Sequence, residues 1–327
     1  MARVLVTGGG GYIGSHACKA LVAAGHEPVT FDNFETGWQD AVQFGPHIVG
    51  DLRDRQAVEA ALRDIRPEAV LHFAALIEVG ASVADPAGYW DNNFRSAKSL
   101  FDAMVATGTK KLVFSSTCAV NGDLDGVEVD ETSPLNPMSP YGASKAAVEL
   151  MLQGYVAAYG LRALTFRYFN VAGADPEAQI GEYHRPETHL VPLVIQAILG
   201  QRGALKVFGE DYPTRDGTCV RDYVHVLDLV AAHVAAIDYL DRDSRVPLLC
   251  LGTGQGMTVR EIIETAEAVT GKRVPHDIAP RRAGDPASLV CGSRLARAEL
   301  GWEPVHSTPE KIITDAWRWH QRAGYTT

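Results

Sequence analysis

The chain of 327 residues carries 30 lysines and arginines against 40 aspartates and glutamates, a formal net charge of −10. This acidic balance argues against general nucleic-acid binding, and no apolar run approaches the roughly 20 residues that span a bilayer. Five scattered cysteines without CxxC spacing argue against a disulfide framework, and the glycine-rich N-terminus lacks the apolar core of a signal peptide. We therefore expect a soluble, cytoplasmic protein.

The first half of the chain alternates short apolar segments with helical patterns. Segments with β-branched and aromatic residues and few charges predict buried strands at Arg3–Thr7, Glu27–Phe31, His47–Val49, Ala69–Ala74, Lys111–Ser115 and Ala163–Tyr168. Helices are expected at Tyr12–Ala24, Arg55–Asp64, Asn92–Thr107 and Pro140–Tyr159, with Gly25, Gly108 and Gly160 as left-handed caps after three of them. The alternation predicts an α/β fold with a Rossmann-type, doubly wound parallel sheet.

After Val171 this alternation stops, and the segment 173–187 is rich in turn formers and charges. A helix is expected at Val191–Leu199, and Asp222–Leu240 and Pro247–Leu251 resume a helix–strand pattern that can return to the first sheet. Thr258 and Thr308 are expected to cap two further helices. We expect a nucleotide-binding domain over 1–170, with return segments around 222–252, and a smaller, partly interleaved α/β substrate domain over 171–327.

A glycine-rich turn follows the first predicted strand. Gly8, Gly11 and Gly14 have GxxGxxG spacing, which suits a tight turn whose backbone amides approach a pyrophosphate at a helix N-terminus. The second predicted strand leads into Asp32, 18 residues beyond Gly14. A carboxylate at this position accepts both ribose hydroxyls of adenosine and repels a 2′-phosphate, so it favours NAD over NADP.

A tyrosine and a lysine stand four residues apart at the start of a predicted helix. Tyr141 and Lys145 share one helix face, with Ser139 as the cap and Pro140 at the first helical position. A neighbouring ammonium and the helix N-terminus favour the phenolate that a base at neutral pH requires. Thr117 follows the fifth predicted strand, at the edge where open α/β sheets bind ligands.

The glycine-rich turn, Asp32 and the tyrosine–lysine pair are typical of the extended short-chain dehydrogenase/reductase family, which the chain resembles nearly from end to end. Within that family it is similar to the enzymes that epimerise carbon 4 of UDP-hexoses. The resemblance is carried by TGGGGYIGSH, FDN, GDLRD, HFAAL, DNN, FSST, PYGASK, RYFNVAGAD, PETHLVPL, VFGEDYPTRDGTCVRDYVHV and RRAGDPA.

The resemblance implies a tightly bound NAD that is regenerated in each turnover. Its expected contacts, from the pyrophosphate and the adenosine to the nicotinamide, are Gly8, Gly11, Tyr12, Ile13, Gly14, Asp32, Asn33, Asp51, Leu52, Phe73, Ala74, Ala75, Asn92, Ser115, Phe169, Tyr141 and Lys145. The expected contacts to a UDP-sugar are Thr117, Tyr141, Asn170, His189, Leu190, Phe208, Arg221, Arg282, Asp285 and Leu289. Arginines also suit a diphosphate independently, because they donate charge-assisted hydrogen bonds.

The implied reaction interconverts UDP-galactose and UDP-glucose. Tyr141, as phenolate, removes the proton of the 4-hydroxyl while carbon 4 gives a hydride to NAD, and Thr117 assists by hydrogen bonding. The 4-keto sugar then turns over in the site, and the hydride returns to its opposite face.

Several alternatives stay open. Epimerases of UDP-N-acetylhexosamines, UDP-pentoses and UDP-uronates share the same core, and Leu289 is smaller than the tyrosine that restricts the sugar pocket in the family. A catalytically silent NAD-binding protein or a dehydrogenase that releases NADH are further alternatives. A 4,6-dehydratase is disfavoured because Cys118 and Ala119, which are neither acid nor base, follow Thr117.

Three positions depart from the family pattern, namely Ile77, Asn121 and His189, and their roles stay open. His72, His184 and His225 lie at predicted strand ends or in loops without ligand spacing, which predicts structural roles and no metal site. Cys118 is expected to pack in the interior. In this family the helices at 92–107 and 140–159 pair across a two-fold axis, so the resemblance implies a homodimer.

Overall fold

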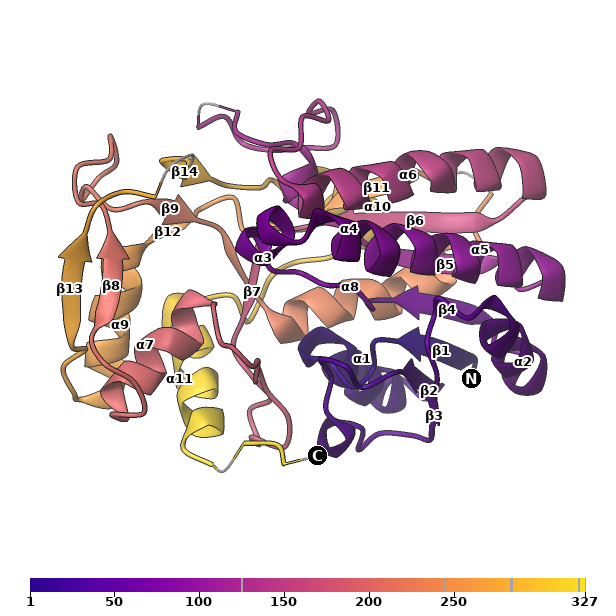
Figure 1. The fold of residues 1–327 in the computed structure, drawn as a ribbon, viewed down its shortest axis with the longest axis horizontal. Helices are drawn as coiled ribbons and strands as arrows, with labels where there is room; N and C mark the ends of the chain where they lie inside the picture. The colour runs from indigo at the N-terminus through magenta and orange to yellow at the C-terminus, as the bar shows by residue number, and fades with distance from the viewer. Residues whose placement is uncertain (125, 244, 283–284, 323, 327) are drawn as a thin grey trace.

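A computed structural model describes residues 1–124, 126–243, 245–282, 285–322 and 324–326, and Figure 1 shows its fold. The strands are β1 (Arg3–Thr7), β2 (Glu27–Asp32), β3 (His47–Val49), β4 (Ala69–His72), β5 (Lys111–Ser115), β6 (Arg162–Arg167), β7 (Asn170–Ala172), β8 (Leu205–Phe208), β9 (Val220–Arg221), β10 (Tyr223–His225), β11 (Leu248–Cys250), β12 (Met257–Thr258), β13 (His276–Ala279) and β14 (Ser288–Leu289). The α-helices are α1 (Tyr12–Ala23), α2 (Arg55–Ile65), α3 (Val79–Ala84), α4 (Pro86–Tyr89), α5 (Ser96–Thr107), α6 (Pro140–Tyr159), α7 (Leu190–Ile198), α8 (Val226–Tyr239), α9 (Val259–Thr270), α10 (Arg294–Leu300) and α11 (Pro309–His320). Short 3₁₀ turns η1 (Gln39–Ala41) and η3 (Cys118–Val120) and a π-helical segment η2 (Trp90–Arg95) complete the chain.

A parallel sheet of seven strands forms the centre of the described chain, in the order β11-β6-β5-β4-β1-β2-β3. Helices α1 and α8 cover one face, and α2, α5 and α6 cover the other (Figure 1). Alternate side chains of each strand enter the two interfaces: Val4 and Val6 pack with α1 and α8, whereas Leu5 packs on the side of α2 and α5. The predicted Rossmann-type, doubly wound sheet is confirmed.

The return of the chain to this sheet explains why its second half is interleaved with the first. Strand β11 pairs in parallel with β6, so Leu249 lies opposite Phe166. The remaining elements pack around a separate core of α7, α9 and α11 with the short strands β8 and β10. In Figure 1 these elements lie together at the left, beside the end of the central sheet.

Every predicted strand and helix of the first half is present; β1, β3, β5 and α6 have the predicted bounds, and the others differ at one or both ends. Strand β4 is shorter than expected because the amides of Phe73 and Ala74 both donate to the carbonyl of Thr7, at 3.1 and 3.2 Å, which turns the chain away from the ladder. The helix expected at Asn92–Thr107 begins earlier, in the π-helical segment η2. The left-handed caps at Gly108 and Gly160 are confirmed. Helix α1 ends at Ala23, two residues before Gly25, which has the expected positive φ of 81°.

The predicted capping box of α9 is present. The hydroxyl of Thr258 accepts the amide of Glu261 at 3.0 Å, and the Glu261 carboxylate accepts the amide of Thr258 at 2.9 Å. The same hydroxyl donates to Asp216 at 2.5 Å, so one buried side chain joins the start of α9 to the loop before β9. By contrast, the cap of α11, Thr308, is exposed and accepts a single amide, that of Lys311.

We expect Thr258→Ala to lower the free energy of unfolding by about 1–2 kcal/mol, because it removes an N-cap and leaves the Oδ2 of Asp216 without the Thr258 donor. Thr308→Ala, which removes a solvent-exposed cap alone, should cost less, about 0.5–1 kcal/mol. Urea unfolding followed by far-UV circular dichroism measures both. Equal losses in the two variants would contradict the role given to the contact with Asp216.

Candidate active site

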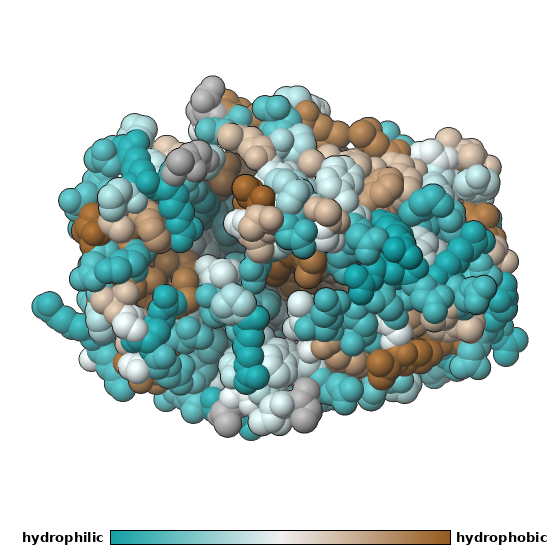
Figure 2. All heavy atoms as spheres, in the orientation of Figure 1, coloured by the Kyte–Doolittle hydropathy of each residue, from teal (hydrophilic) through white to brown (hydrophobic). Residues whose placement is uncertain are grey.

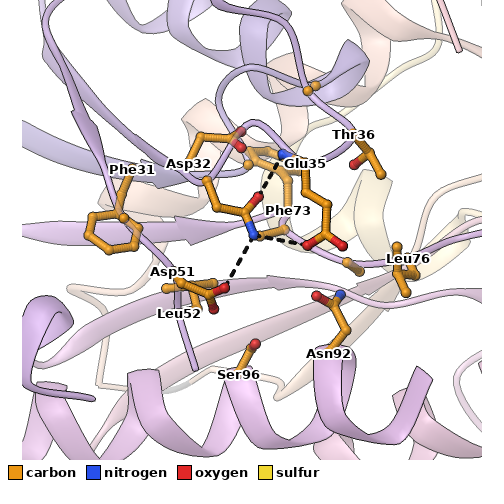
Figure 3. A pocket seen from close by; sticks show the side chains of 17 residues that line it. Phe31, Asp32, Glu35, Thr36, Asp51, Leu52, Phe73, Leu76, Asn92 and Ser96 are labelled. Atoms are coloured by element: carbon orange, nitrogen blue, oxygen red, sulfur yellow. Dashed lines mark hydrogen bonds between the residues drawn. The ribbon is translucent and has the colours of Figure 1, made fainter. Parts of the chain in front are cut away.

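An open-sided cavity lies at the carboxyl ends of β1, β2 and β4. Its lining includes seventeen described residues from the glycine turn, the end of β2 and the loop after it, the loops after β3 and β4, and the helical segment η2–α5. Figure 3 shows the cavity from close by. In Figure 2 the face of the molecule is hollowed near its centre, between the part that holds β8 and β13 and the part that holds α3 and α5.

The glycine turn explains why the cavity can hold a diphosphate. Gly8 has φ +75°, and a Cβ there would lie 2.6 Å from the amide nitrogen of Ala74. A Cβ at Gly14 would lie 2.1 Å from the carbonyl oxygen of Gly8. Helix α1 starts after Gly11 without a capping side chain, so the N–H groups of Tyr12 and Ile13 are available to an anion at the positive end of the helix.

Asp32 performs two tasks at the end of β2. Its carboxylate accepts the amide of Gly10 at 2.9 Å and that of Phe34 at 2.8 Å, which fixes the glycine turn beside the strand. Burial raises the pKa of Asp32, and the backbone hydrogen bonds partly offset this rise. Since each carboxylate oxygen has a second lone pair, the predicted contact with the ribose hydroxyls is still geometrically available.

The side chains predicted to surround the adenosine lie on opposite walls of the cavity in Figure 3. The amide of Asn33 donates to Asp51 at 3.4 Å and to Glu35 at 3.3 Å. Leu52 is buried beside Asp51, and Asn92 projects into the cavity from η2. The loop after β4 supplies the predicted cofactor residues Phe73, Ala74 and Ala75 to the same lining.

Asn93, which the sequence analysis did not single out, holds this loop in place. Its buried side chain accepts the amide of Leu76 at 2.8 Å and donates to the carbonyl of Leu76 at 3.0 Å. It also donates to the hydroxyl of Ser144 on α6 at 3.3 Å. The DNN segment signals an amide here, but only the fold shows which of its two asparagines faces inward.

Tyr141 lies at the N-terminus of α6, where Ser139 accepts the amide of Gly142 at 3.2 Å and Pro140 takes the first helical position. Burial raises the pKa of Tyr141 to about 12, and a hydrogen bond with Thr117 partly offsets that rise. Thr117 itself caps the 3₁₀ turn η3 by accepting the amide of Ala119 at 3.1 Å. The structure therefore brings Tyr141 and Thr117 into contact at the carboxyl edge of β5.

Lys145, one turn further along α6, is buried. Its Nζ donates to the carbonyl of Ser115 at 2.8 Å and lies 4.9 Å from the centre of the Phe114 ring. Burial lowers the pKa of Lys145 to about 8, against the opposing influence of Glu149. Ser115, a predicted cofactor contact, accepts Lys145 with its carbonyl oxygen, and its hydroxyl faces the Nε2 of His233 at 2.9 Å.

A buried ion pair that the sequence analysis missed lies beneath this lysine. Glu149 accepts from Arg167 at 3.0 and 2.5 Å and from the hydroxyl of Ser116 at 2.5 Å. Glu149 is four residues after Lys145, so α6 carries the pair on the face that contains the active-site residues. The i,i+4 spacing of Tyr141, Lys145 and Glu149 was a usable signal.

The predicted substrate residues other than Thr117 and Tyr141 lie in the second half of the chain. Arg221 on β9 pairs with Asp285 and donates to the carbonyl of Val220 at 2.7 Å. The guanidinium of Arg282 stacks on the ring of Phe208, 3.9 Å from its centroid. Leu289 is the partner of Arg221 in the β14–β9 ladder. Ala283 and Gly284 of the RRAGDPA segment lie outside the described residues.

The other predicted substrate and cofactor residues surround the join between the two halves. Asn170 begins β7, and its amide donates to the carbonyl of Asp222 at 3.1 Å. Phe169 packs against the cluster of Cys118, Cys250 and Cys291, so the expected interior packing of Cys118 agrees with its surroundings. His189 is the N-cap residue of α7, and Leu190 is the first residue of that helix.

The departures from the family pattern have separate surroundings. The amide of Asn121 is buried and donates to the carbonyls of Ser133 and Pro134, at 3.0 and 2.9 Å, so this residue closes a loop. Ile77 is partly exposed and carries no polar group.

Two of the histidines with predicted structural roles make local hydrogen bonds. His72 contacts the hydroxyl of Thr7 at 2.7 Å, and His225 accepts the amide of Leu227 as the cap of α8 at 3.1 Å.

A doubly wound parallel sheet with a dinucleotide pocket and an adjoining tyrosine–lysine pair defines a nucleotide-dependent enzyme of the dehydrogenase type. Residues 4–246 match the NAD dependent epimerase/dehydratase family, and the chain belongs to it. NAD is its cofactor, and the resemblance to nucleotide-sugar 4-epimerases is confirmed by the comparisons that follow. Among the described residues, no helix has the length and hydropathy to cross a membrane.

The chain is similar to characterised enzymes along almost its whole length. It is 49% identical to the UDP-glucose 4-epimerase of Rhizobium meliloti over 320 residues, which cover 98% of this chain and 97% of that one. The structure of UDP-glucose 4-epimerase from Brucella ovis in complex with NAD has a TM-score of 0.95 at 44% identity, covering 97% of this chain and 98% of that one. The enzyme from Stenotrophomonas maltophila, with bound NAD and formylated UDP-arabinopyranose, has a TM-score of 0.95 at 41% identity and 98% coverage of both chains.

We expect Gly14→Ala to abolish retention of NAD, because its Cβ would collide with the carbonyl of Gly8 and open the turn that receives the pyrophosphate. Absorbance of the purified protein after heat release of the cofactor measures NAD occupancy. Gly80→Ala is the matched control, since a Cβ in helix α3 meets nothing within 4 Å. Full NAD occupancy in Gly14→Ala would contradict this role of the turn.

We expect Lys145→Met to stabilise the NAD-free protein at pH 7 by about 2 kcal/mol, because the gain from removing a buried charge exceeds the lost hydrogen bond to Ser115. The unfolded chain binds this proton with the ordinary lysine pKa of 10.5, and the folded chain with a pKa of about 8. Between these values the unfolded state holds more protons, so wild-type stability rises with pH and the advantage of the variant shrinks.

Urea unfolding at pH 7 and pH 10 tests this difference. The surface variant Lys110→Met is the control, because it also removes an ammonium that donates to a carbonyl, that of Tyr159 at 2.9 Å. The difference in unfolding free energy between Lys145→Met and the wild type could instead stay constant from pH 7 to pH 10. That result would show that the buried ammonium of Lys145 does not destabilise the folded protein.

Proposed function

We propose that this chain interconverts UDP-galactose and UDP-glucose, with NAD as a resident cofactor. The observation that carries the proposal is the contact between Tyr141 and Thr117 above the buried Lys145, at the same sheet edge as the glycine turn. The names of the relatives support it, since full-length chains at 43 to 49% identity are UDP-glucose 4-epimerases.

When bound, NAD supplies a reversible hydride acceptor for carbon 4 of the sugar. Tyr141 removes the proton from the 4-hydroxyl and later returns it to the 4-oxygen, when the hydride comes back to the opposite face of carbon 4. In the NAD-free protein burial keeps this phenol protonated, so the positive charge of Lys145 and of the oxidised cofactor must favour the phenolate. The hydroxyl of Thr117 donates a hydrogen bond to the 4-oxygen of the sugar and so orients the sugar.

The uridine diphosphate is held by the predicted set on the second half of the chain. Arg221 and Arg282 supply charge to the diphosphate, and Asp285, Phe208, Asn170, His189 and Leu190 surround the remaining nucleotide. Tethering at the diphosphate leaves the hexose free to turn between the two half-reactions. Leu289, beside Arg221, is proposed to line the sugar pocket.

The same proposal assigns the halves of the chain. Residues 1–170 with the return segments around 222–252 bind NAD, and 171–327 bind the UDP-sugar. The parallel pairing of β11 with β6 supports the return. We also propose a reducing, cytoplasmic location, which the five free cysteines support.

Incubation of the purified protein with UDP-galactose and no added NAD, followed by chromatography, should give an equilibrium mixture with UDP-glucose and no net NADH. Tyr141→Phe should lower kcat by about 10²–10⁴-fold, because it removes the acid–base group and leaves the NAD pocket intact. Tyr239→Phe, which removes a hydroxyl at the end of α8 that donates to Glu299 on α10, should keep wild-type activity.

Conversion of N-acetylhexosamine, pentose or uronate nucleotides in place of UDP-galactose would keep the mechanism and replace the substrate. Net NADH formation would favour a conventional dehydrogenase. Inactivity on all these nucleotides, with NAD bound, would favour a silent NAD-binding protein.

We further propose that α5 and α6 pair with their counterparts in a second copy of the chain. An apolar side chain on the outer face of α6 supports this, since Leu150 is 57% exposed. Because this face points away from the central sheet, a partner helix would bury it.

Light scattering at micromolar concentration should therefore give a mass near twice the 35.3 kDa of the chain. Leu150→Arg should shift the protein towards the monomer, because it places a charge in a buried helix interface. Val305→Arg is the control, an exposed apolar residue far from α6 in sequence. A wild-type monomer would overturn the assembly.

A further inference from the structure

Four ligand-type side chains gather in the loop before α7, where the sequence analysis predicted no metal site. Glu182, His184, Glu187 and His189 each offer one nitrogen or oxygen atom, and these atoms all lie within 4.8 Å of one another. The group is local in sequence, with the pattern Glu-x-His-x-x-Glu-x-His.

Two atoms of this group face one another without a hydrogen-bond partner. The Nδ1 of His184 and the Oε2 of Glu187 are both buried and form no hydrogen bond among the described residues, and they lie 3.5 Å apart, within ion-pair distance when the imidazole is protonated. The side chain of Glu187 is only 5% exposed. A buried polar atom without a partner is costly, so a further group at this position would be strongly favoured.

The spacing around His184 suits a metal ion, whereas Glu182 and His189 form a closer ion pair. The Nδ1 of His184 lies 3.4 Å from Glu182 and 3.5 Å from Glu187, longer than a charge-assisted hydrogen bond of roughly 2.7–2.9 Å. Ligand bonds of about 2.0–2.2 Å in a tetrahedron place neighbouring ligand atoms about 3.3–3.6 Å apart. The fourth atom, Nδ1 of His189, is hydrogen-bonded to Glu182 and would release its proton on metal binding.

The surrounding backbone already orients the carboxylates. The Oε1 of Glu187 accepts the amides of Thr188 and His189 at 2.8 and 2.9 Å, which directs its Oε2 into the group. The Glu182 side chain is 3% exposed, and its backbone carbonyl accepts the indole N–H of Trp319 at 2.9 Å. Two carboxylates with neutral imidazoles carry two negative charges, which a divalent cation balances.

We propose that Glu182, His184, Glu187 and His189 form a binding site for a divalent transition-metal ion of the zinc type. Two imidazoles favour zinc over calcium and magnesium, which prefer all-oxygen sites. The ion joins the loop at 182–187 to His189, the N-cap of α7. It therefore fixes the loop that precedes the start of this helix, and it takes no part in the proton transfer at Tyr141. The proposal does not depend on the substrate of the enzyme.

The test uses the full-length protein with its resident NAD, stripped of metals by a chelator. Titration with ZnCl₂ by calorimetry should show one equivalent of binding, and zinc should raise the melting temperature. CoCl₂ should give the intense visible absorption of a tetrahedral site. His184→Asn and Glu187→Gln should each weaken binding at least about 100-fold and remove the thermal shift, because each removes a ligand.

His276→Asn is the matched control, because this exposed histidine on β13 lies outside the group and should keep full zinc binding. Two outcomes would overturn the site: no binding of zinc at micromolar concentration by the wild type, or binding and thermal shift unchanged in both His184→Asn and Glu187→Gln. If one variant fails to fold, the other and the cobalt spectrum of the wild type still decide the question.

Discussion

The buried ammonium of Lys145 is the constraint on which the active site depends. An unpaired charge in the interior is costly, so Nζ must donate to the carbonyl of Ser115, and this bond fixes α6 against the end of β5. With α6 held there, Tyr141 meets Thr117 at the strand end. The ion pair of Glu149 and Arg167 completes a polar seam between helix and sheet, so the whole face of α6 has one position.

A second buried carboxylate fixes the substrate half to this frame. Asp222 accepts the amides of Thr253 and Gly254 at 3.0 Å and that of Cys291 at 3.2 Å. Its own backbone joins Leu289 and Asn170. Because these partners come from three distant segments, one aspartate determines where the strand that carries Arg221 lies relative to β7. The hollow between the two parts is therefore built from rigid contacts.

Sequence predicted the elements whose boundaries are set locally. Strands β1, β3 and β5 and helix α6 have the predicted bounds, since β-branched runs, Ser139–Pro140 and Gly160 act within a few residues. The pairs of two-residue strands around Arg221 carry no such local signal, because they form only when distant loops meet. The inward orientation of the Asn93 side chain and the ion pair between Glu149 and Arg167 likewise depend on tertiary contacts. The proposed metal ligands do form a local sequence pattern of two glutamates and two histidines. The usual spacing rules for zinc sites are written for cysteine ligands and therefore miss it.

An acidic protein that receives an anionic nucleotide must concentrate its positive charge. The overall charge of −10 repels such a substrate at long range, but salt screens this repulsion beyond about 10 Å. At contact distance the decisive groups are Arg221, already oriented by Asp285, and Arg282, flattened on Phe208. Each guanidinium has lost its conformational freedom before the nucleotide arrives, so less entropy is lost on binding. Local preorganisation of two arginines, together with the N-terminus of α1, can therefore outweigh the charge of the whole chain.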